Sequence, residues 1–145
     1  MIRIAVVDDN EMIRKQVKRF LNTYALKNSV VFEIYTYEDG HLLTLDINHE
    51  MHFDLIYLDI EMPIKTGLDV LEWIRANQSE TKVVIVTTFK RKGYFKRALA
   101  AHVDAYVLKE RSISDLMATI HTVLAGQKEY SPELVEGVAF DNNPL

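Results

Sequence analysis

The sequence predicts an α/β fold, a doubly wound parallel sheet of five strands in the order 2-1-3-4-5 with five covering helices. Short β-branched and apolar runs alternate along the chain with amphipathic segments of helical period. Parallel strands need helical crossovers of one hand, and this alternation supplies them. Charged or hydroxyl residues follow several of the runs, as expected at the ligand-binding edge of such a sheet.

The first half of the chain predicts three strands and two helices. Residues 2–7 form an apolar, β-branched run that is too short for a helix, so we expect a strand there. Ile13, Val17 and Leu21 recur at helical spacing and basic residues fill the other face, which predicts an amphipathic helix. The remaining elements of this half are a strand at residues 30–37, a short helix at 38–47 and a strand at 54–59.

The second half continues the alternation. Pro63 and Gly67 mark a loop, and residues 67–77 follow it with an apolar stripe of helical period. Ser131 and Pro132 can begin one more helical turn near the end of the chain. The expected elements between these segments are a strand at 82–87, a helix at 94–101, a strand at 105–108 and a last helix from Ser112 or Ser114 to the stop signal Gly126.

Length and composition indicate one globular domain. The 145 residues are 48% hydrophobic, enough for a core without disulfides, and the absence of cysteine excludes a thiol nucleophile and a cysteine-based zinc site. A net charge of −4 disfavours nucleic-acid binding by this chain alone. No apolar stretch approaches the roughly 20 residues that span a bilayer, so we expect a soluble cytoplasmic protein without a membrane partner. We assign residues 1–126 to this domain and residues 127–145 to the start of an interdomain linker.

Five side chains stand at the ends of the predicted strands: Asp8 and Asp9 on the first, Asp59 on the third, Thr87 on the fourth and Lys109 on the fifth. Because the first and third strands are neighbours, we expect the three acids to converge at one edge of the sheet. Clustered carboxylates repel one another unless a cation compensates them, and Mg²⁺ takes oxygen ligands of this kind. A carboxylate nucleophile beside a divalent cation, a lysine and a hydroxyl is the set that phosphoryl transfer to aspartate requires.

The motifs VVDDN, YLDIEMP, VIVTTF and AYVLK, in this order between residues 2 and 125, resemble the receiver domain of two-component response regulators, which has a flavodoxin-like fold. The resemblance implies that Asp59 accepts a phosphoryl group. It also implies a Mg²⁺ site, which Mn²⁺ could occupy instead, formed by Asp8, Asp9, Asp59 and the backbone carbonyl of Glu61. Asp9 would bind the metal directly, and Asp8 through a water molecule.

The resemblance assigns the remaining site residues and the partners as well. Thr87 and Lys109 would contact phosphoryl oxygens, and Tyr106 would be the aromatic residue that turns inward when Thr87 moves to the phosphoryl group. A sensor histidine kinase would donate that group, and phosphorylation would favour a homodimer. The chain would not be an enzyme beyond its own phosphorylation and dephosphorylation, and it would reach DNA only through a C-terminal domain beyond Leu145.

Two branches of the family resemble different parts of the chain. KTGL, TTFKRKGYF and YVLKERS are most similar to the NarL/FixJ branch with a LuxR-type helix-turn-helix output, near regulators of membrane-lipid desaturation and cell-envelope stress. SPEL followed by NPL resembles the linker of that branch, so we expect a chain truncated before its DNA-binding domain. FEIYTYEDG and FDLIYLDIEMP are similar to receivers joined to LytTR domains, so the type of output domain stays open.

Three residues depart from the common receiver pattern. Glu110 follows Lys109 where many receivers have proline after a cis bond, and we expect a trans bond because a cis bond before a non-proline residue costs about 3 kcal/mol. Ile64 stands where such loops often carry glycine. Glu61 adds negative charge near the phosphorylation site, and we expect it to change the lifetime of the phosphoryl group.

Three other functions stay open at this point. A haloacid-dehalogenase-like phosphatase also uses a strand-end aspartate, magnesium and lysine, but it carries a DxD pattern after its first strand where this chain has Asp8 and Asp9 side by side. A flavin protein of the same fold needs a hydroxyl-rich phosphate loop there, and acids repel phosphate. A receiver that works as a phosphorylation-independent interaction module is disfavoured by the intact acids, Thr87 and Lys109, which do not exclude it.

Overall fold

The computed structural model describes residues 1–78, 80–88, 91–109 and 113–141. Its strands are β1 (Ile2–Val7), β2 (Phe32–Tyr37), β3 (Leu55–Asp59), β4 (Lys82–Thr87), β5 (Ala105–Leu108) and β6 (Glu129–Tyr130). Its helices are α1 (Glu11–Asn28), α2 (Gly40–Asn48), α3 (Gly67–Asn77), α4 (Lys92–Ala100), α5 (Ile113–Leu124) and α6 (Pro132–Asp141). The bond between Lys109 and Glu110, the helix start expected at Ser112 and the motif at 143–145 lie outside the described residues.

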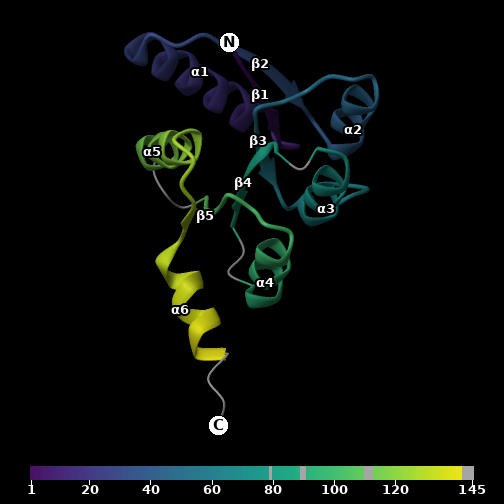
Figure 1. The fold of residues 1–145 in the computed structure, drawn as a ribbon, viewed down its shortest axis with the longest axis vertical. Helices are drawn as coiled ribbons and strands as arrows, with labels where there is room; N and C mark the ends of the chain where they lie inside the picture. Colours follow the sequence, from purple (N-terminus) through teal and green to yellow (C-terminus); the bar gives the residue numbers. More distant parts are fainter. Residues whose placement is uncertain (79, 89–90, 110–112, 142–145) are drawn as a thin grey trace.

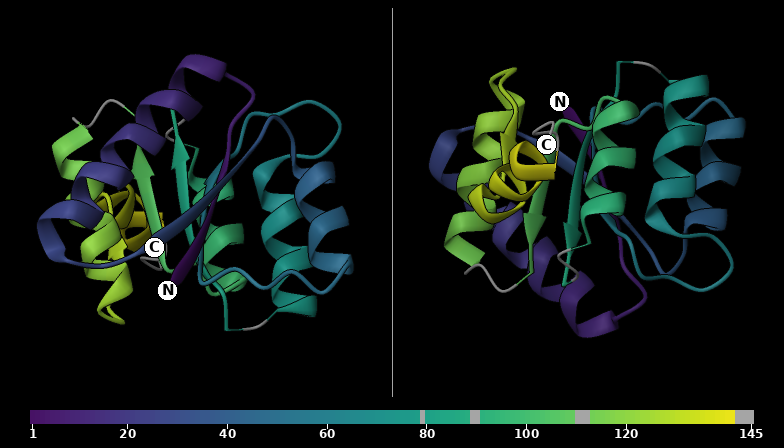
Figure 2. Two further views of the ribbon diagram at one scale, coloured as in Figure 1. Left: turned by 90° about the horizontal axis from the view of Figure 1, so that it is seen from above. Right: turned by 90° about the horizontal axis from the view of Figure 1, so that it is seen from below.

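The strands form one parallel sheet in the order β2-β1-β3-β4-β5-β6. Figure 1 labels the first five strands of the chain. Helices α1 and α5 cover one face, and α2, α3 and α4 cover the other, as both views in Figure 2 show. The expected order of the first five strands is confirmed. The sixth strand was not predicted, because two residues are too few to show a period. Helix α6 contacts α4 and exceeds the single turn expected after Ser131. No described helix is both long enough and apolar enough to cross a lipid bilayer.

Each face of the sheet buries its own apolar cluster. The cluster beneath α1 and α5 includes Tyr57 and Ile120, and the cluster on the other face includes Phe95 and Tyr106. Side chains alternate between the two faces along a strand, so Asp59 follows Tyr57 on the face that α1 and α5 cover. The alternation therefore decides on which side of the sheet the acid lies.

The register of the sheet brings the ends of the strands to one edge. Strands β1 and β3 are paired up to the residues that precede Asp8 and Asp59, so these two acids lie next to each other. The backbone N–H of Lys109 donates a hydrogen bond to the carbonyl oxygen of Thr87 (2.8 Å), which places Lys109 just beyond the end of β4. The polar residues at four strand ends are thus held by the backbone of the sheet itself.

The loop between β3 and α3 carries a strained residue. Ile64 has a φ of 73° and is 83% exposed, whereas β-branched residues disfavour the left-handed region strongly. Hydrogen bonds from the N–H groups of Met62 and Gly67 to the carbonyl of Ile60 (3.1 and 2.9 Å) close the loop on both sides of Ile64. The departure from the glycine common at this position therefore has a conformational cost.

Replacing Ile64 with Gly is expected to stabilise the domain by about 1 kcal/mol, because relief of the left-handed strain outweighs the added entropy of the unfolded chain. Little burial is lost, since the side chain is exposed. Urea unfolding of the variant measures the change. Ile64→Val keeps the β-branch and should unfold like the unmodified protein; equal stability of the Gly and Val variants would contradict the strain.

Candidate functional site

Three carboxylates meet where β1 and β3 end. Asp8 is fully buried, Asp59 is 1% exposed and Asp9 is exposed to solvent. One carboxylate oxygen from each residue lies within 4.8 Å of the other two. The structure brings together the three acids that the expected strand order placed at one edge.

Lys109 reaches into this acidic cluster from the end of β5. Its Nζ lies 3.0 Å from Asp8 Oδ2 and 3.3 Å from Asp59 Oδ1. Burial alone would lower the pKa of Lys109, but the contacts with Asp8 and Asp59 outweigh burial and raise that pKa, so the lysine is protonated. One positive charge thus offsets only part of the charge of three acids.

Asp59 is difficult to ionise in this site. Burial and the negative charge of Asp8 raise the pKa of Asp59 from 3.8 to about 6, while Lys109 and the backbone N–H of Glu61 lower it by less. Burial, followed by the charges of Asp8 and Asp59, also raises the pKa of Tyr57, which lies two residues before Asp59 on β3. The site therefore carries an excess of negative charge that a cation would relieve.

The start of α1 orients Asp8. The backbone N–H of Asn10 donates a hydrogen bond to Asp8 Oδ1 (2.9 Å), and the Arg14 guanidinium donates one to the backbone carbonyl of Asp8 (2.7 Å). Asn10 in turn caps α1 by accepting a hydrogen bond from the N–H of Ile13 (3.2 Å). Because the loop holds Oδ1, the other oxygen of Asp8 is left to face Lys109.

The acidic cluster fits a divalent cation. Apart from the ion pairs with Lys109, the buried oxygens Asp8 Oδ2 and Asp59 Oδ1 have no hydrogen-bond partner among the described residues. Such buried acceptors are costly when they stay unsatisfied. With the exposed carboxylate of Asp9 beside them, these oxygens form the hard donor set that Mg²⁺ takes together with water.

Glu61 joins the site to the end of β4. Its Oε1 accepts hydrogen bonds from Thr87 Oγ1 (3.2 Å) and Thr88 Oγ1 (2.9 Å). Thr87 is buried, whereas Thr88 is exposed. The expectation for Glu61 concerned its backbone carbonyl and its charge, and the hydrogen bonds of its side chain were not predicted. The adjacent hydroxyl residues in VTTF were the only signal of them in the sequence.

Tyr106 lies on the opposite face of the sheet from Asp59 and is fully buried. Its ring packs against Phe95 at a centroid distance of 5.2 Å. Its hydroxyl has no hydrogen-bond partner among the described residues. Burial first, and then the neighbouring Tyr94 and Glu61, raise the pKa of Tyr106. The Tyr106 side chain therefore points into the core in the same structure in which Thr87 donates its hydrogen bond to Glu61.

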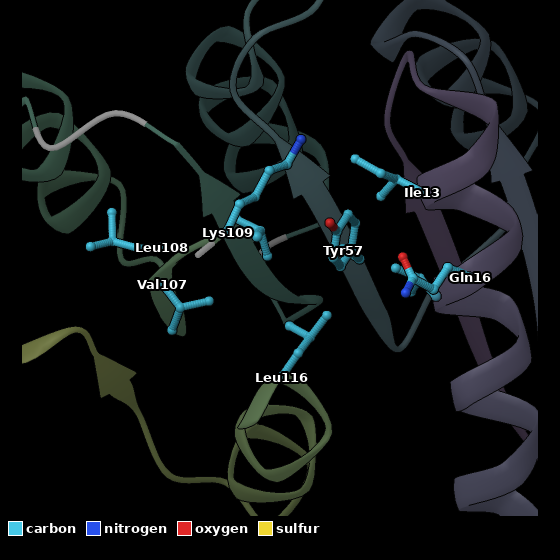
Figure 3. A pocket seen from close by; sticks show the side chains of 9 residues that line it. Ile13, Gln16, Tyr57, Val107, Leu108, Lys109 and Leu116 are labelled. Atoms are coloured by element: carbon cyan, nitrogen blue, oxygen red, sulfur yellow. The ribbon is translucent and has the colours of Figure 1, made fainter. Parts of the chain in front are cut away.

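A cavity of about 110 Å³ lies between α1, α5 and the sheet, beside Lys109. Figure 3 shows Lys109 and Tyr57 at this cavity, with Ile13 and Gln16 on α1 and Leu116 on α5 around them. The lining is mostly apolar and suits the aliphatic part of the lysine side chain. The cavity leaves open space beside the side chain of Lys109.

Comparisons with known proteins identify relatives of this chain. The family model described as "Response regulator receiver domain" matches residues 4–121. Transcriptional regulatory protein DesR of Bacillus subtilis (strain 168) is 35% identical over 145 residues, which are 100% of this chain and 69% of that protein. The uncharacterized transcriptional regulatory protein YvfU of the same organism is 42% identical over 92 residues, 63% of this chain and 46% of YvfU.

A solved structure agrees with these relatives. The crystal structure of a DNA-binding response regulator of the LuxR family from Staphylococcus aureus is 40% identical to this chain, with a TM-score of 0.73, and the match covers 85% of this chain and 98% of that one. The LuxR family is the branch expected from KTGL, TTFKRKGYF and YVLKERS. The family model, the two regulators and the fold agree, and the chain belongs to the receiver domain family of two-component response regulators.

Proposed function

We propose that this receiver accepts a phosphoryl group on Asp59 in the presence of Mg²⁺ and that the modification controls an output domain. The observation that carries the proposal is the convergence of Asp8, Asp9, Asp59 and Lys109 at the carboxyl edge of the sheet. Such a set provides a nucleophile, oxygen ligands for a cation and a fixed positive charge. An isolated acidic residue on the surface provides none of these together.

The residues of the site have separate roles in the transfer. An ionised Asp59 oxygen attacks the phosphorus atom of a phosphohistidine on the kinase, so a P–O bond forms as the P–N bond breaks and the histidine leaves. Asp8, Asp9, the carboxylate of Asp59 and the backbone carbonyl of Glu61 would hold the Mg²⁺. When bound, Mg²⁺ supplies positive charge that compensates the phosphoryl oxygens.

The remaining residues respond to the new dianion. Lys109 exchanges its ion pair with Asp59 for a phosphoryl oxygen, and Thr87 donates its hydroxyl to another. Movement of Thr87 changes the space available to Tyr106 on the neighbouring strand. A change in the position of Thr87 can thereby shift the equilibrium between two conformations of the surface around α4 and β5 by about 1–3 kcal/mol.

The proposed partners follow from this role. A sensor histidine kinase in the cytoplasm supplies the phosphoryl group, and the altered surface favours a homodimer. We assign residues 1–126 to the receiver and regard residues 127–145 as the beginning of a connection to a LuxR-type DNA-binding domain. The chain spans 46% of YvfU and 69% of DesR, two proteins named as transcriptional regulators.

Incubation with beryllofluoride and Mg²⁺, followed by ¹⁹F NMR, tests the chemistry directly. The expected result is a bound beryllofluoride signal for the unmodified protein and its complete loss in Asp59→Asn. Asp46→Asn is the matched control and should bind beryllofluoride normally. Asp46 is a carboxylate on α2 that accepts a hydrogen bond from the hydroxyl of Tyr37 and lies outside the acidic cluster. An equal signal in Asp59→Asn would refute the assignment, and turnover of a phosphate ester would favour the phosphatase instead.

A further inference from the structure

The carboxylate of Glu61 occupies a position that matters for Thr87. Glu61 Oε1 accepts the hydroxyls of both Thr87 (3.2 Å) and Thr88 (2.9 Å). Glu61 follows Asp59 by two residues, so the acceptor that binds the threonines lies directly after the strand β3 that ends with the nucleophile. The three residues Glu61, Thr87 and Thr88 form a small network between the β3–α3 loop and the end of β4.

This network competes with a phosphoryl group on Asp59. A threonine hydroxyl has one proton to donate, and the proton of Thr87 is directed to Glu61. A phosphoryl oxygen can receive it only after that hydrogen bond breaks. The Glu61 carboxylate also carries the same sign of charge as the phosphoryl group, so the two acceptors oppose each other electrostatically as well.

We infer that Glu61 is a positioning residue that holds Thr87 in the unphosphorylated arrangement, and that Thr88 sets the strength of this hold. Thr88 contributes because it donates to the same Oε1 atom and so keeps the carboxylate beside Thr87. The inference rests on the proposed phosphorylation of Asp59. It predicts that weakening the network makes the receiver bind a phosphoryl mimic more tightly, although a hydrogen bond has been removed.

Thr88→Val tests the network without touching the acids or the backbone carbonyl of Glu61. Titration with beryllofluoride at saturating Mg²⁺, followed by ¹⁹F NMR, is expected to show about threefold tighter binding than in the unmodified protein, the scale of one exposed charge-assisted hydrogen bond. Glu61→Gln removes the charge and weakens the acceptor, and it should tighten binding by about tenfold. Thr88→Ser, in contrast, keeps a hydroxyl and should bind beryllofluoride with the affinity of the unmodified protein.

Two controls separate this effect from general changes of stability. Thr23→Val makes the same substitution on α1, where the hydroxyl donates to the backbone carbonyl of Arg19, and should leave the beryllofluoride affinity unchanged. Thr88→Val should also leave the Mg²⁺ affinity of the free protein unchanged, because Thr88 donates to the side chain of Glu61, whereas the proposed Mg²⁺ ligands are the three aspartates and the backbone carbonyl of Glu61.

The outcomes distinguish this inference from the proposed function. Tighter binding in Thr88→Val and Glu61→Gln, with rescue by Thr88→Ser, supports the competition. Normal beryllofluoride binding by the unmodified protein with equal or weaker binding in both variants overturns the competition and leaves phosphorylation of Asp59 intact. Failure of the unmodified protein to bind beryllofluoride at Asp59 overturns both.

Discussion

In the absence of metal, the free energy of unfolding of Asp59→Asn relative to that of the unmodified protein is expected to increase by about 2 kcal/mol between pH 4 and pH 7. The pKa of Asp59 in the folded protein is raised from 3.8 to about 6 by burial and by Asp8. A raised folded-state pKa contributes stability below pH 3.8 that is lost as the pH rises through about 6. Asparagine cannot ionise, so the variant avoids this loss.

Urea unfolding in EDTA at pH 4, 5.5 and 7 measures the difference between the two proteins. The comparison cancels the titration of groups that do not interact with Asp59, such as Glu33, whose pKa is lowered first by its hydrogen bond to Tyr35 and also by Arg3. Mg²⁺ should stabilise the unmodified protein more than Asp59→Asn at pH 7. Parallel stability curves in EDTA would show that Asp59 ionises without cost.

Gly67→Ala is expected to destabilise the domain by about 3 kcal/mol, because the new methyl group has no space. A Cβ atom at Gly67 would lie 2.3 Å from the carbonyl oxygen of Asp59 and 2.9 Å from Cα of Ile60. These are backbone atoms, so the contact cannot be relieved by a side-chain rotation. The end of β3 must move, and the carboxylate of Asp59 moves with it.

Two measurements are expected to change together in this variant: the free energy of unfolding in urea, and the beryllofluoride affinity in the fraction that stays folded. Gly93→Ala in α4 is the matched control, since a Cβ there meets no atom within 4 Å. It should stabilise the helix by about 0.5 kcal/mol and leave binding unchanged. A Gly67→Ala protein with unchanged stability and affinity would show that β3 and α3 adjust to each other easily.

Local patterns predicted most of the fold. Strands such as residues 82–87 are continuous apolar runs, and α1 shows its helical period clearly, because these signals depend only on neighbours in the sequence. Strand β6 escaped prediction because it has two residues and exists only through its pairing with β5. The extension of the last segment into α6 depends in the same way on contact with α4.

The same distinction between local sequence signals and tertiary contacts applies to the candidate site. The sequence by itself determined that Asp8, Asp9, Asp59, Thr87 and Lys109 stand at strand ends, since a parallel sheet of this order aligns those ends whatever the loops do. Only the tertiary structure decided that the Glu61 side chain binds both threonines and that Ile64 is held at a positive φ. Both depend on the path of one loop across the sheet edge, and a difference of one or two ångströms in that path makes or breaks such a contact.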